Sequence, residues 1–414
     1  MEEKKLVPKL RFPGFTEPWE QRKLGEIVER ITRKNNEQSD RPLTISAQDG
    51  LVDQCEYFDR QVASRDMSNY YLIKKGEFAY NKSYSDGYPF GAIKRLDYYD
   101  KGALSTLYII FKIVDGRIDS DFMVAYYMTS LWHKEISKRA AEGARNHGLL
   151  NISTEDFFNS ELKIPNDIKE QIKVGKFINQ FDQYITLHQR KLEHLKLKKK
   201  SLLQKLFPKE GEVYPELRFP GFTDPWEQRK LGEIVKIERG GSPRPIDNYI
   251  TTDADGLNWI KIGDAPEQGR YIVHAAEKIK PLGLSKTRQV EPGDLILSNS
   301  MSFGKPYIMS IHGCIHDGWL LIRNNQNIFD LKFLCNLLGT EQLHAQYRRL
   351  AAGSAVNNLN KELVSGTNVG VPSKAEQLKI GQFFENLDEY ITLHQRKLEH
   401  LQLLKKALLQ QLFV

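Results

Sequence analysis

The sequence predicts a mixed α/β (α+β) protein with two globular domains and two long coiled-coil helices, organised as an internal repeat. Three observations lead to this prediction. A nearly identical segment opens each half of the chain, a similar helix-like segment closes each half, and the stretches between them agree in length but not in sequence. The repeat distance of 207 residues is far longer than a solenoid unit and indicates a duplicated domain.

The opening segment occurs at residues 10–28, LRFPGFTEPWEQRKLGEIV, and at residues 217–235, LRFPGFTDPWEQRKLGEIV, with a single Glu-to-Asp difference. The closing segment occurs at residues 170–207 and again at 376–413, and both copies contain YITLHQRKLEHL. Each half therefore has the same order of flank, variable stretch and flank.

The two variable stretches, residues 29–169 and 236–375, have 141 and 140 residues. A few framework positions still match in spacing: Gly76, Gly87, Pro89, Ile152 and Pro165 with Gly293, Gly304, Pro306, Leu359 and Pro372. Apolar runs predict strands at 77–80, 104–114, 258–262, 294–297, 307–311 and 319–323, and amphipathic helices at 120–141 and 331–350. The same scaffold is therefore expected to carry two different surfaces.

Each closing segment predicts a long helix, because apolar residues alternate three and four positions apart over four heptads. This spacing is typical of a coiled coil, and each helix is the natural partner of the other. The expected interface residues are Ile178, Phe181, Ile185, Leu192, Leu195 and Leu202 in the first helix and Leu387, Ile391, Leu398, Leu401 and Leu408 in the second. The alternative is that each helix packs only on its own domain.

These patterns place domain boundaries along the chain. The first globular domain is expected at 1–167, the central long helix at 168–210, the second domain at 211–373 and the C-terminal long helix at 374–414. The Pro- and Gly-rich segment 207–222 is expected to connect the two halves.

Composition excludes several protein classes. Hydrophobic residues at 40% and charged residues at 27% are ordinary for a folded domain, and a net charge of +7 is compatible with a polyanionic partner without requiring one. No stretch approaches the roughly 18 apolar residues of a membrane helix, and the start MEEKKLVPKL has no apolar signal core. Three cysteines without CxxC spacing favour a reducing, cytoplasmic location.

Catalytic motifs are missing from the sequence. It contains no phosphate-binding Gly-x-x-x-x-Gly-Lys-Ser/Thr, no G-x-G-x-x-G after a strand, no Asn/Asp-Pro-Pro-aromatic run and no Gly-x-Ser-x-Gly. We therefore predict no catalytic residue, no bound metal and no cofactor in this chain. His312, Cys314 and His316 would share a strand face and offer zinc ligands, but neighbouring strand ligands make a poor tetrahedral set and the other half has no counterpart.

Two different surfaces on a helical framework suit a bipartite target, and duplex DNA offers sites on one side every ~34 Å. Arg and Lys suit guanine edges, Asn and Gln suit adenine edges, and phosphates need further cations. The candidate DNA-binding residues are Asn81, Lys82, Ser83, Tyr84, Lys94, Arg145, Asn146 and His147 in the first domain and Arg244, Lys261, Ser298, Asn299, Ser302, Lys305, Asn357 and Asn358 in the second. The alternative for each is a solvated polar loop.

The layout resembles the specificity (S) subunit of type I restriction–modification enzymes, and the resemblance covers nearly the whole chain. Each half is similar to a target-recognition domain of that family followed by its shared helical region. The similarity lies in the entry sequences PKLRFPGFTEPWEQRKLGEI and PELRFPGFTDPWEQRKLGEI, in the exits KIPNDIKEQIKVGKFINQFDQYI and GVPSKAEQLKIGQFFENLDEYI, and in ERGGSPRP and GEFAYNKSYSDGYPFGAI.

The resemblance implies a non-catalytic subunit that reads a bipartite, asymmetric DNA sequence, one half per domain. It implies two modification subunits that carry S-adenosylmethionine and methylate adenine N6, and two restriction subunits that use ATP and magnesium for translocation and cleavage. The two long helices would pack antiparallel with pseudo-twofold symmetry. In that arrangement the domains and helices would form a closed ring. Since the chain stops at Val414, one residue past the repeat, closure of this ring would depend on the helix seam.

Two other hypotheses remain at this stage. The chain could be a stand-alone nuclease or methyltransferase with an unrecognised site, or a protein-binding scaffold that uses two variable domains without DNA. The specificity subunit is favoured because the missing methyl-donor and nucleotide motifs agree with a division of labour between subunits.

Overall fold

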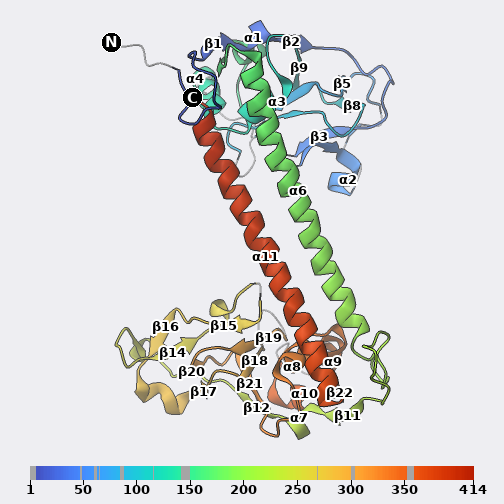
Figure 1. The fold of residues 1–414 in the computed structure, drawn as a ribbon, viewed down its shortest axis with the longest axis vertical. Coiled ribbons are helices and arrows are strands. Elements are labelled where there is room, and N and C mark those ends of the chain that lie inside the picture. The colour runs from blue at the N-terminus through green and yellow to red at the C-terminus, as the bar shows by residue number, and fades with distance from the viewer. Residues whose placement is uncertain are drawn as a thin grey trace. The chain divides into compact units, whose positions relative to one another are not determined.

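The computed structural model describes residues 6–46, 49–59, 63–64, 66–83, 88–114, 116–140, 150–267, 269–299, 304–351 and 359–414. They form two compact units (Figure 1): unit 1 comprises Met1–Leu187 and Leu398–Val414, and unit 2 comprises His188–Lys397. The division falls inside both long helices, α6 (Ile168–Lys205) and α11 (Lys374–Leu412). Each unit therefore contains one globular domain, the start of one long helix and the end of the other, whereas the sequence-based boundaries treat the helices as separate domains.

The globular part of unit 1 is mixed α/β, as predicted. Its main sheet has the strand order β2-β9-β6-β7, and smaller sheets pair β3 with β4, β5 with β8 and β1 with β10. The elements are β1 Glu20–Lys23, α1 Leu24–Ile27, β2 Val28–Ile31, β3 Leu43–Ser46, β4 Gly50–Asp53, α2 Gln54–Phe58, β5 Tyr71–Lys74, β6 Phe78–Asn81, β7 Ala92–Arg95, β8 Lys101–Leu104, β9 Ile109–Ile113, α3 Ser120–Tyr127, α4 Leu131–Arg139, α5 Thr154–Phe158 and β10 Glu161–Ile164.

The globular part of unit 2 has two five-stranded sheets, with orders β12-β21-β18-β19-β15 and β13-β16-β14-β20-β17. The strands are β11 Glu227–Lys230, β12 Lys236–Arg239, β13 Ile250–Thr251, β14 Leu257–Ile260, β15 Tyr271–Ile272, β16 Glu277–Ile279, β17 Arg288–Val290, β18 Leu295–Ser298, β19 Pro306–Met309, β20 Gly313–Ile315, β21 Trp319–Arg323 and β22 Asn368–Val371. The helices are α7 Leu231–Ile234, η2 Ile246–Asn248, η3 Ile262–Asp264, η4 Pro281–Lys286, α8 Leu331–Leu338, α9 Glu341–Ala351 and α10 Lys361–Ser365.

The two units share one framework, which confirms the predicted internal repeat. The order β2-β9-β6-β7 in unit 1 corresponds strand by strand to β12-β21-β18-β19 in unit 2, where β15 adds a parallel edge strand. The pairing of β1 with β10 corresponds to that of β11 with β22 in the same register. Gly76 and Gly293 both adopt positive φ, +85° and +91°, so the turn before β6 is the same as the turn before β18.

Both predicted amphipathic helices are interrupted, and the expectation of one continuous helix in each is wrong. In unit 1, Thr129 separates α3 from α4; its hydroxyl donates to the Tyr126 carbonyl at 2.7 Å and accepts from the Leu131 N–H at 3.2 Å. In unit 2, Thr340 separates α8 from α9 in the same way, donating to Leu337 at 2.7 Å. A side-chain hydroxyl that replaces backbone partners ends a helix that apolar periodicity alone would continue.

The predicted strand at 104–114 is also interrupted. The backbone turns between β8 and β9, where the Tyr108 N–H donates to the Ser105 carbonyl at 3.1 Å. The other predicted strands are present with ends shifted by up to two residues.

An ion pair ties the entry segment of each unit to its long helix. Arg11 makes a two-pronged contact with Glu170, with both N–O distances 2.8 Å, and Arg218 contacts Glu376 with the same two distances. Both carboxylates are almost completely buried in the first turn of α6 or α11. A carboxylate near a helix N-terminus also interacts favourably with the helix dipole.

The residue after each of these glutamates fixes the angle between helix and domain. Gln171 accepts from the Asp119 N–H at 2.8 Å and donates to the Pro165 carbonyl at 2.9 Å. Gln377 makes the same pair of bonds with Asp330 and Pro372, at 2.8 and 3.0 Å. One turn later, a glycine of each long helix packs on the N-terminus of a short helix. An added Cβ at Gly175 would lie 2.4 Å from the Phe122 nitrogen of α3, and one at Gly381 would lie 2.6 Å from Oδ1 of Asp330, the residue that caps α8.

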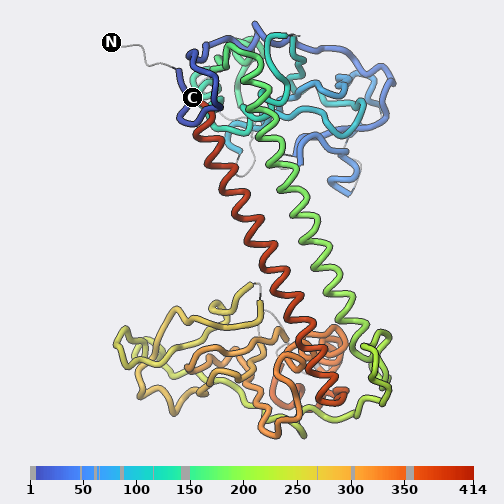
Figure 2. Tube along the Cα trace, in the orientation of Figure 1, coloured from blue at the N-terminus to red at the C-terminus, as the bar shows by residue number. Residues whose placement is uncertain are grey.

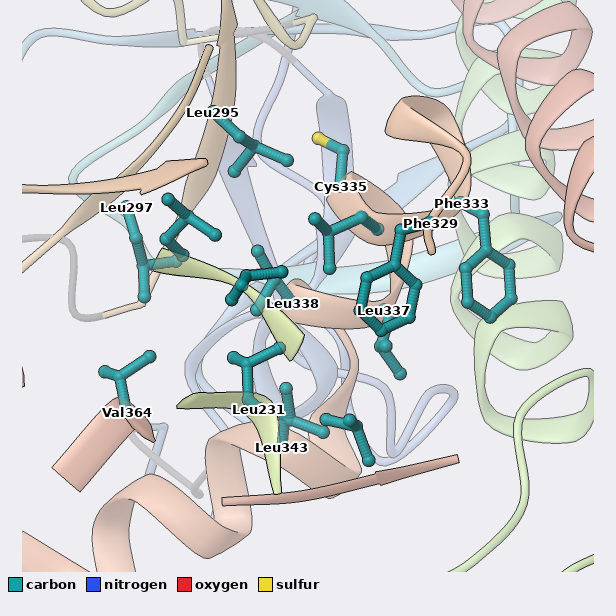
Figure 3. Close-up of a cluster of buried hydrophobic side chains, with 14 of the residues drawn as sticks. Leu231, Leu295, Leu297, Phe329, Phe333, Cys335, Leu337, Leu338, Leu343 and Val364 are labelled. Atoms are coloured by element: carbon teal, nitrogen blue, oxygen red, sulfur yellow. The ribbon is translucent and has the colours of Figure 1, made fainter. Parts of the chain in front are cut away.

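The end of a long helix completes each hydrophobic core. In unit 2, Leu206 and Phe207 join the cluster around Phe333 that Figure 3 shows from β18, α8 and α9. In unit 1, Leu412 and Phe413 join the corresponding cluster. The ring centroids lie 5.9 Å apart for Phe207 and Trp226 and 6.0 Å apart for Phe413 and Trp19.

A backbone hydrogen bond accompanies this packing in each unit. The Leu10 N–H donates to the Gln411 carbonyl at 3.0 Å, and the Leu217 N–H donates to the Lys205 carbonyl at 2.9 Å. Figure 2 shows the red end of α11 beside the blue N-terminal segment of unit 1. The expectation that closure depends on the helix seam alone is therefore wrong, because the last residues of α11 are part of the core of unit 1.

The seam positions of both helices are buried or half-buried. In unit 1 the start of α6 pairs with the end of α11, through Asp182 and Lys405; in unit 2 the end of α6 pairs with the start of α11, through Lys199 and Asp388 at 2.5 Å. The helices are thus antiparallel within each unit, as predicted. The fully buried interface residues are Ile178, Ile185, Leu192, Leu195, Ile391 and Leu398, and the half-buried ones are Phe181, Leu202, Leu387, Leu401 and Leu408.

The first turns of each long helix also pack on the globular domain of their own unit. The alternative to a coiled coil, in which each helix packs on its own domain, therefore holds for these turns. Val174 and Ile178 belong to the core of unit 1, and Ile380 and Phe384 to that of unit 2. Neither long helix, nor any other helix in the part of the chain described, is apolar enough over a sufficient length to cross a membrane.

Lys199 lies in the most densely charged part of the seam. Asp388 accepts from Lys199 and from the buried Arg270 of unit 2. Burial, with a smaller contribution from the Arg270 charge, lowers the pKa of the Lys199 amine to about 8. The folded chain therefore binds this proton less tightly than the unfolded chain does.

We predict that Phe413→Ala destabilises unit 1 by about 3–5 kcal/mol, because it leaves a cavity beside Trp19. Phe207→Ala should destabilise unit 2 by a similar amount. Urea unfolding followed by tryptophan fluorescence measures both, and Leu403→Ala, at an exposed helix position, is the control that should change little. A large loss for one Phe and none for the other would contradict the equivalence of the two cores.

We also predict that the free energy of unfolding rises by about 1 kcal/mol between pH 7 and pH 9 through Lys199. Below its folded pKa the buried amine is charged and costs stability; above it the amine is neutral and the cost disappears, while the unfolded chain still holds the proton. Lys199→Met should lose this increment, and the exposed Lys200→Met should keep it. Identical pH profiles for the wild type and Lys199→Met would contradict the assignment.

Candidate nucleic-acid interface

Three loops of unit 2 that are distant in sequence meet at one place. They are the Gly-rich loop after β12, the end of β18 and the turn between β20 and β21. The Gly240 N–H donates to the Trp319 carbonyl at 2.9 Å, and the Gly241 N–H donates to the Ile315 carbonyl at 3.2 Å. An added Cβ at Gly240 would lie 2.2 Å from the His316 carbonyl oxygen, so only glycine permits this approach.

Asp317 organises the side chains where these loops meet. Its carboxylate accepts from the Ser242 hydroxyl at 3.0 Å and from an Arg244 guanidinium nitrogen at 3.5 Å, and its Oδ1 lies 3.0 Å from His316 Nε2. His316 Nδ1 accepts from the Gly318 N–H at 2.9 Å, which places the imidazole proton on Nε2, toward Asp317. The Asp317 carbonyl accepts from the Asn299 side chain at 2.9 Å. We call these residues, Ser242, Arg244, Asn299, His316 and Asp317, the Asp317 cluster.

An open groove of about 1100 Å³ lies beside the Asp317 cluster. Arg244 stands at this groove with 81% of its side chain exposed. Lys261 and Glu277 also line it, with the Lys261 amine paired to the Glu277 carboxylate. The remaining lining residues are Ser242, Pro243, Pro245, Ile246, Asp247, Ile250, Trp259 and His316.

Three other candidates in unit 2 are occupied with the protein itself. The buried Ser298 hydroxyl accepts from the Lys305 N–H at 3.0 Å. The Lys305 amine donates to the Glu267 carbonyl at 3.0 Å and lies 5.1 Å from the centre of the Tyr307 ring. Asn299 is buried, and its backbone bonds to Gly318 and Leu359 as well. Of these three, only Asn299 contacts the Asp317 cluster.

The described candidates of unit 1 lie at the end of β6, just after it and on β7. Asn81 accepts from the Ser83 N–H at 3.0 Å, and the Lys82 carbonyl accepts from the Leu150 N–H at 3.0 Å. Lys94 lies on β7, half-buried, and burial lowers the pKa of its amine, with Lys405 adding to the shift. Lys94 is paired with Ala79 of β6 in the sheet, and the charges of Lys405 and Asp182 in the long helices act on its amine.

The comparisons with known proteins agree with this architecture. The family model of the type I restriction modification DNA specificity domain matches residues 223–403. The MjaX type I restriction enzyme specificity subunit of Methanocaldococcus jannaschii is 23% identical over 415 residues, which cover 97% of this chain and 94% of that protein. The chain is thus similar to a type I restriction enzyme specificity subunit over nearly its whole length, and the family model matches its second half.

Two solved structures share the fold of this chain. The S subunit of a type I restriction–modification system from M. genitalium matches with a TM-score of 0.58 and 15% identity, covering 99% of both chains. A chain from a structure on complex assembly and conformational transition of the type I R-M system matches with a TM-score of 0.56 and 17% identity, covering 98% of this chain and 99% of that one.

Several of the predicted DNA-binding residues lie outside the described residues. They are Tyr84, Arg145, Asn146, His147, Ser302, Asn357 and Asn358. The remaining candidates stay predictions as DNA contacts. The structure brings Arg244 together with Asn299 and leaves Lys305 engaged elsewhere in unit 2.

Sequence reasoning missed Asp317 and weighed His316 only as a zinc ligand. An aspartate before a glycine in a turn carries no specific signal, because its partners Ser242 and Arg244 are more than 70 residues away. Within the described ranges, no three His, Cys, Asp or Glu side chains are grouped to hold a metal ion. Cys314 is buried among Trp259 and Ile279.

We predict that Asn299→Ala lowers the free energy of unfolding by about 1–2 kcal/mol, because the part-buried Asp317 carbonyl loses its donor at 2.9 Å and keeps only the Arg239 Nε–H at 3.5 Å. The matched change Asn81→Ala, at a half-buried position with one bond to its own loop, should cost about 1 kcal/mol or less. Urea unfolding measures both. Weakened DNA binding by Asn299→Ala at unchanged stability would instead indicate a direct contact.

Proposed function

We propose that this specificity subunit reads a bipartite, asymmetric DNA sequence, one half-site per globular domain, in the cytoplasm. It is the DNA-recognition component of a type I restriction–modification complex and is not itself catalytic. In this proposal it directs adenine-N6 methylation and ATP-dependent restriction by its partner subunits. S-adenosylmethionine, ATP and magnesium belong to those partners, and this chain binds no cofactor.

The observation that carries the proposal is one framework with two different loop surfaces. The strand order, the Arg–Glu pairs and the glutamine contacts recur in both units. The Asp317 cluster does not recur in unit 1. When β6 and β9 are matched to β18 and β21 by their strand pairing, Thr106 takes the position of Asp317. Equal scaffolds with unequal loops favour two different half-sites over one repeated site.

The helices support a stoichiometry of two modification subunits. Unit 1 exposes Tyr184, Leu187 and Leu403, and unit 2 exposes the repeat-equivalent Tyr390, Leu393 and Leu197. Exposed apolar residues at matched helix positions favour protein contacts over solvent. Two equivalent sets would bind two copies of one partner, and two restriction subunits would follow the same symmetry.

We predict that co-expression with its modification subunit produces N6-methyladenine at one bipartite motif, and that either protein alone produces none. Single-molecule sequencing of host DNA maps the modification. Methylation by the isolated chain would contradict a non-catalytic role. Co-purification without methylation would contradict the recognition role, and absence of both association and methylation would favour a scaffold without DNA.

A further inference from the structure

We propose that Arg244 reads a guanine in the half-site of the second domain, and that Asp317 is the positioning residue that directs it. This inference rests on the proposed function and extends it to one base pair. Arg244 combines high exposure with a fixed carboxylate partner beside an open groove.

The guanidinium of Arg244 is available for a bidentate contact. Its side chain is 81% exposed, and one Nη atom lies 3.5 Å from Asp317. An arginine presents five N–H donors in a planar fork, so one restrained edge leaves another edge for a ligand. The O6 and N7 atoms of guanine match that fork in the major groove.

Asp317 can direct this arginine because it is itself held in place. Ser242 donates to its carboxylate and Asn299 donates to its carbonyl. His316 Nε2 contacts the same carboxylate at 3.0 Å. A side chain held by several bonds loses little further freedom on binding, and so does the arginine that it restrains.

The loop that carries Arg244 is also restrained. Pro243 and Pro245 flank the arginine, and a proline ring fixes its own φ and limits the residue before it. An added Cβ at the nearby Gly241 would lie 2.7 Å from the Lys286 carbonyl oxygen. The loop is therefore packed closely against its neighbour, which limits the positions available to the arginine.

The charge of the groove favours a base edge over a phosphate. Asp247 and Glu277 line it together with the two cations Arg244 and Lys261, and Asp317 lies next to it. Carboxylates repel a phosphate, whereas the edge of a base pair carries donors as well as acceptors. Lys261 forms a close ion pair with Glu277, whereas Arg244 lies 3.5 Å from Asp317. Arg244 is therefore the more available of the two cations.

The test uses the complete modification complex and maps N6-methyladenine in host DNA for the wild type, Arg244→Ala, Arg244→Lys and Asp317→Asn. Arg244→Ala should relax one guanine position in one half-site by about tenfold to a hundredfold and leave the other half-site unchanged. Arg244→Lys should restore part of the preference. Asp317→Asn should weaken preference at the same position, because the arginine loses its charged partner.

The matched control is Arg288→Ala. Arg288 contacts Glu238 at 3.4 Å in the same domain and does not line the groove. It should leave the motif unchanged. Equal loss of all methylation in Arg244→Ala and Arg288→Ala would overturn the inference, since it would indicate general damage to the domain.

Two further outcomes separate this inference from the proposed function. The inference alone is wrong if the wild type and Arg244→Ala methylate the same bipartite motif with the same base preference at every position. It is also wrong if neither half of the motif contains a guanine. If the wild type co-purifies with its partner and methylates nothing, the proposed function is wrong and the inference falls with it.

Discussion

The packing of a Leu-Phe pair from the end of a long helix into each globular core is the contact on which the rest of the structure depends. Leu206 and Phe207 meet Trp226 in unit 2, and Leu412 and Phe413 occupy the same place in unit 1. Each globular core is thus completed by the helix that does not begin there. Folding of a domain and pairing of the helices are consequently one event, and helix ends, which usually fray, become part of a core.

A second consequence concerns where sequence variation is tolerated. The contacts between helix and domain use the buried Glu170 and Glu376, their neighbouring glutamines and two glycines without room for a side chain. The glutamines bond to backbone atoms, each glutamate binds one arginine of the entry segment, and Glu170 also accepts from the Trp19 indole N–H at 3.3 Å. Because the backbone is common to all residues, the loops at the far ends of the strands can differ without disturbing these contacts.

The sequence predicted the long helices, their seam and the repeat because each depends on local periodicity or on identity between two segments. It missed the breaks at Thr129 and Thr340, where one hydroxyl replaces a backbone partner inside an otherwise amphipathic run. It selected Arg244 and Asn299 from residue type, but it could not foresee that Asn299 turns inward while Arg244 stays exposed. That difference is set by Asp317, which lies far away in the sequence, and only the fold brings the three residues together.

The matched contacts also describe how genes of this kind can exchange parts. A crossover in the DNA that encodes residues 10–28 or 217–235 replaces Arg11 by an identical Arg218, or the reverse, so the ion pair with the helix survives any such event. The cap residues Asp119 and Asp330 lie inside the variable stretches and still bond to Gln171 and Gln377. The bond to the glutamine uses the backbone N–H of this residue, which any residue but proline supplies. An incoming stretch therefore needs only a residue that caps the next helix here, as the carboxylates of Asp119 and Asp330 cap α3 and α8 at 2.9 Å.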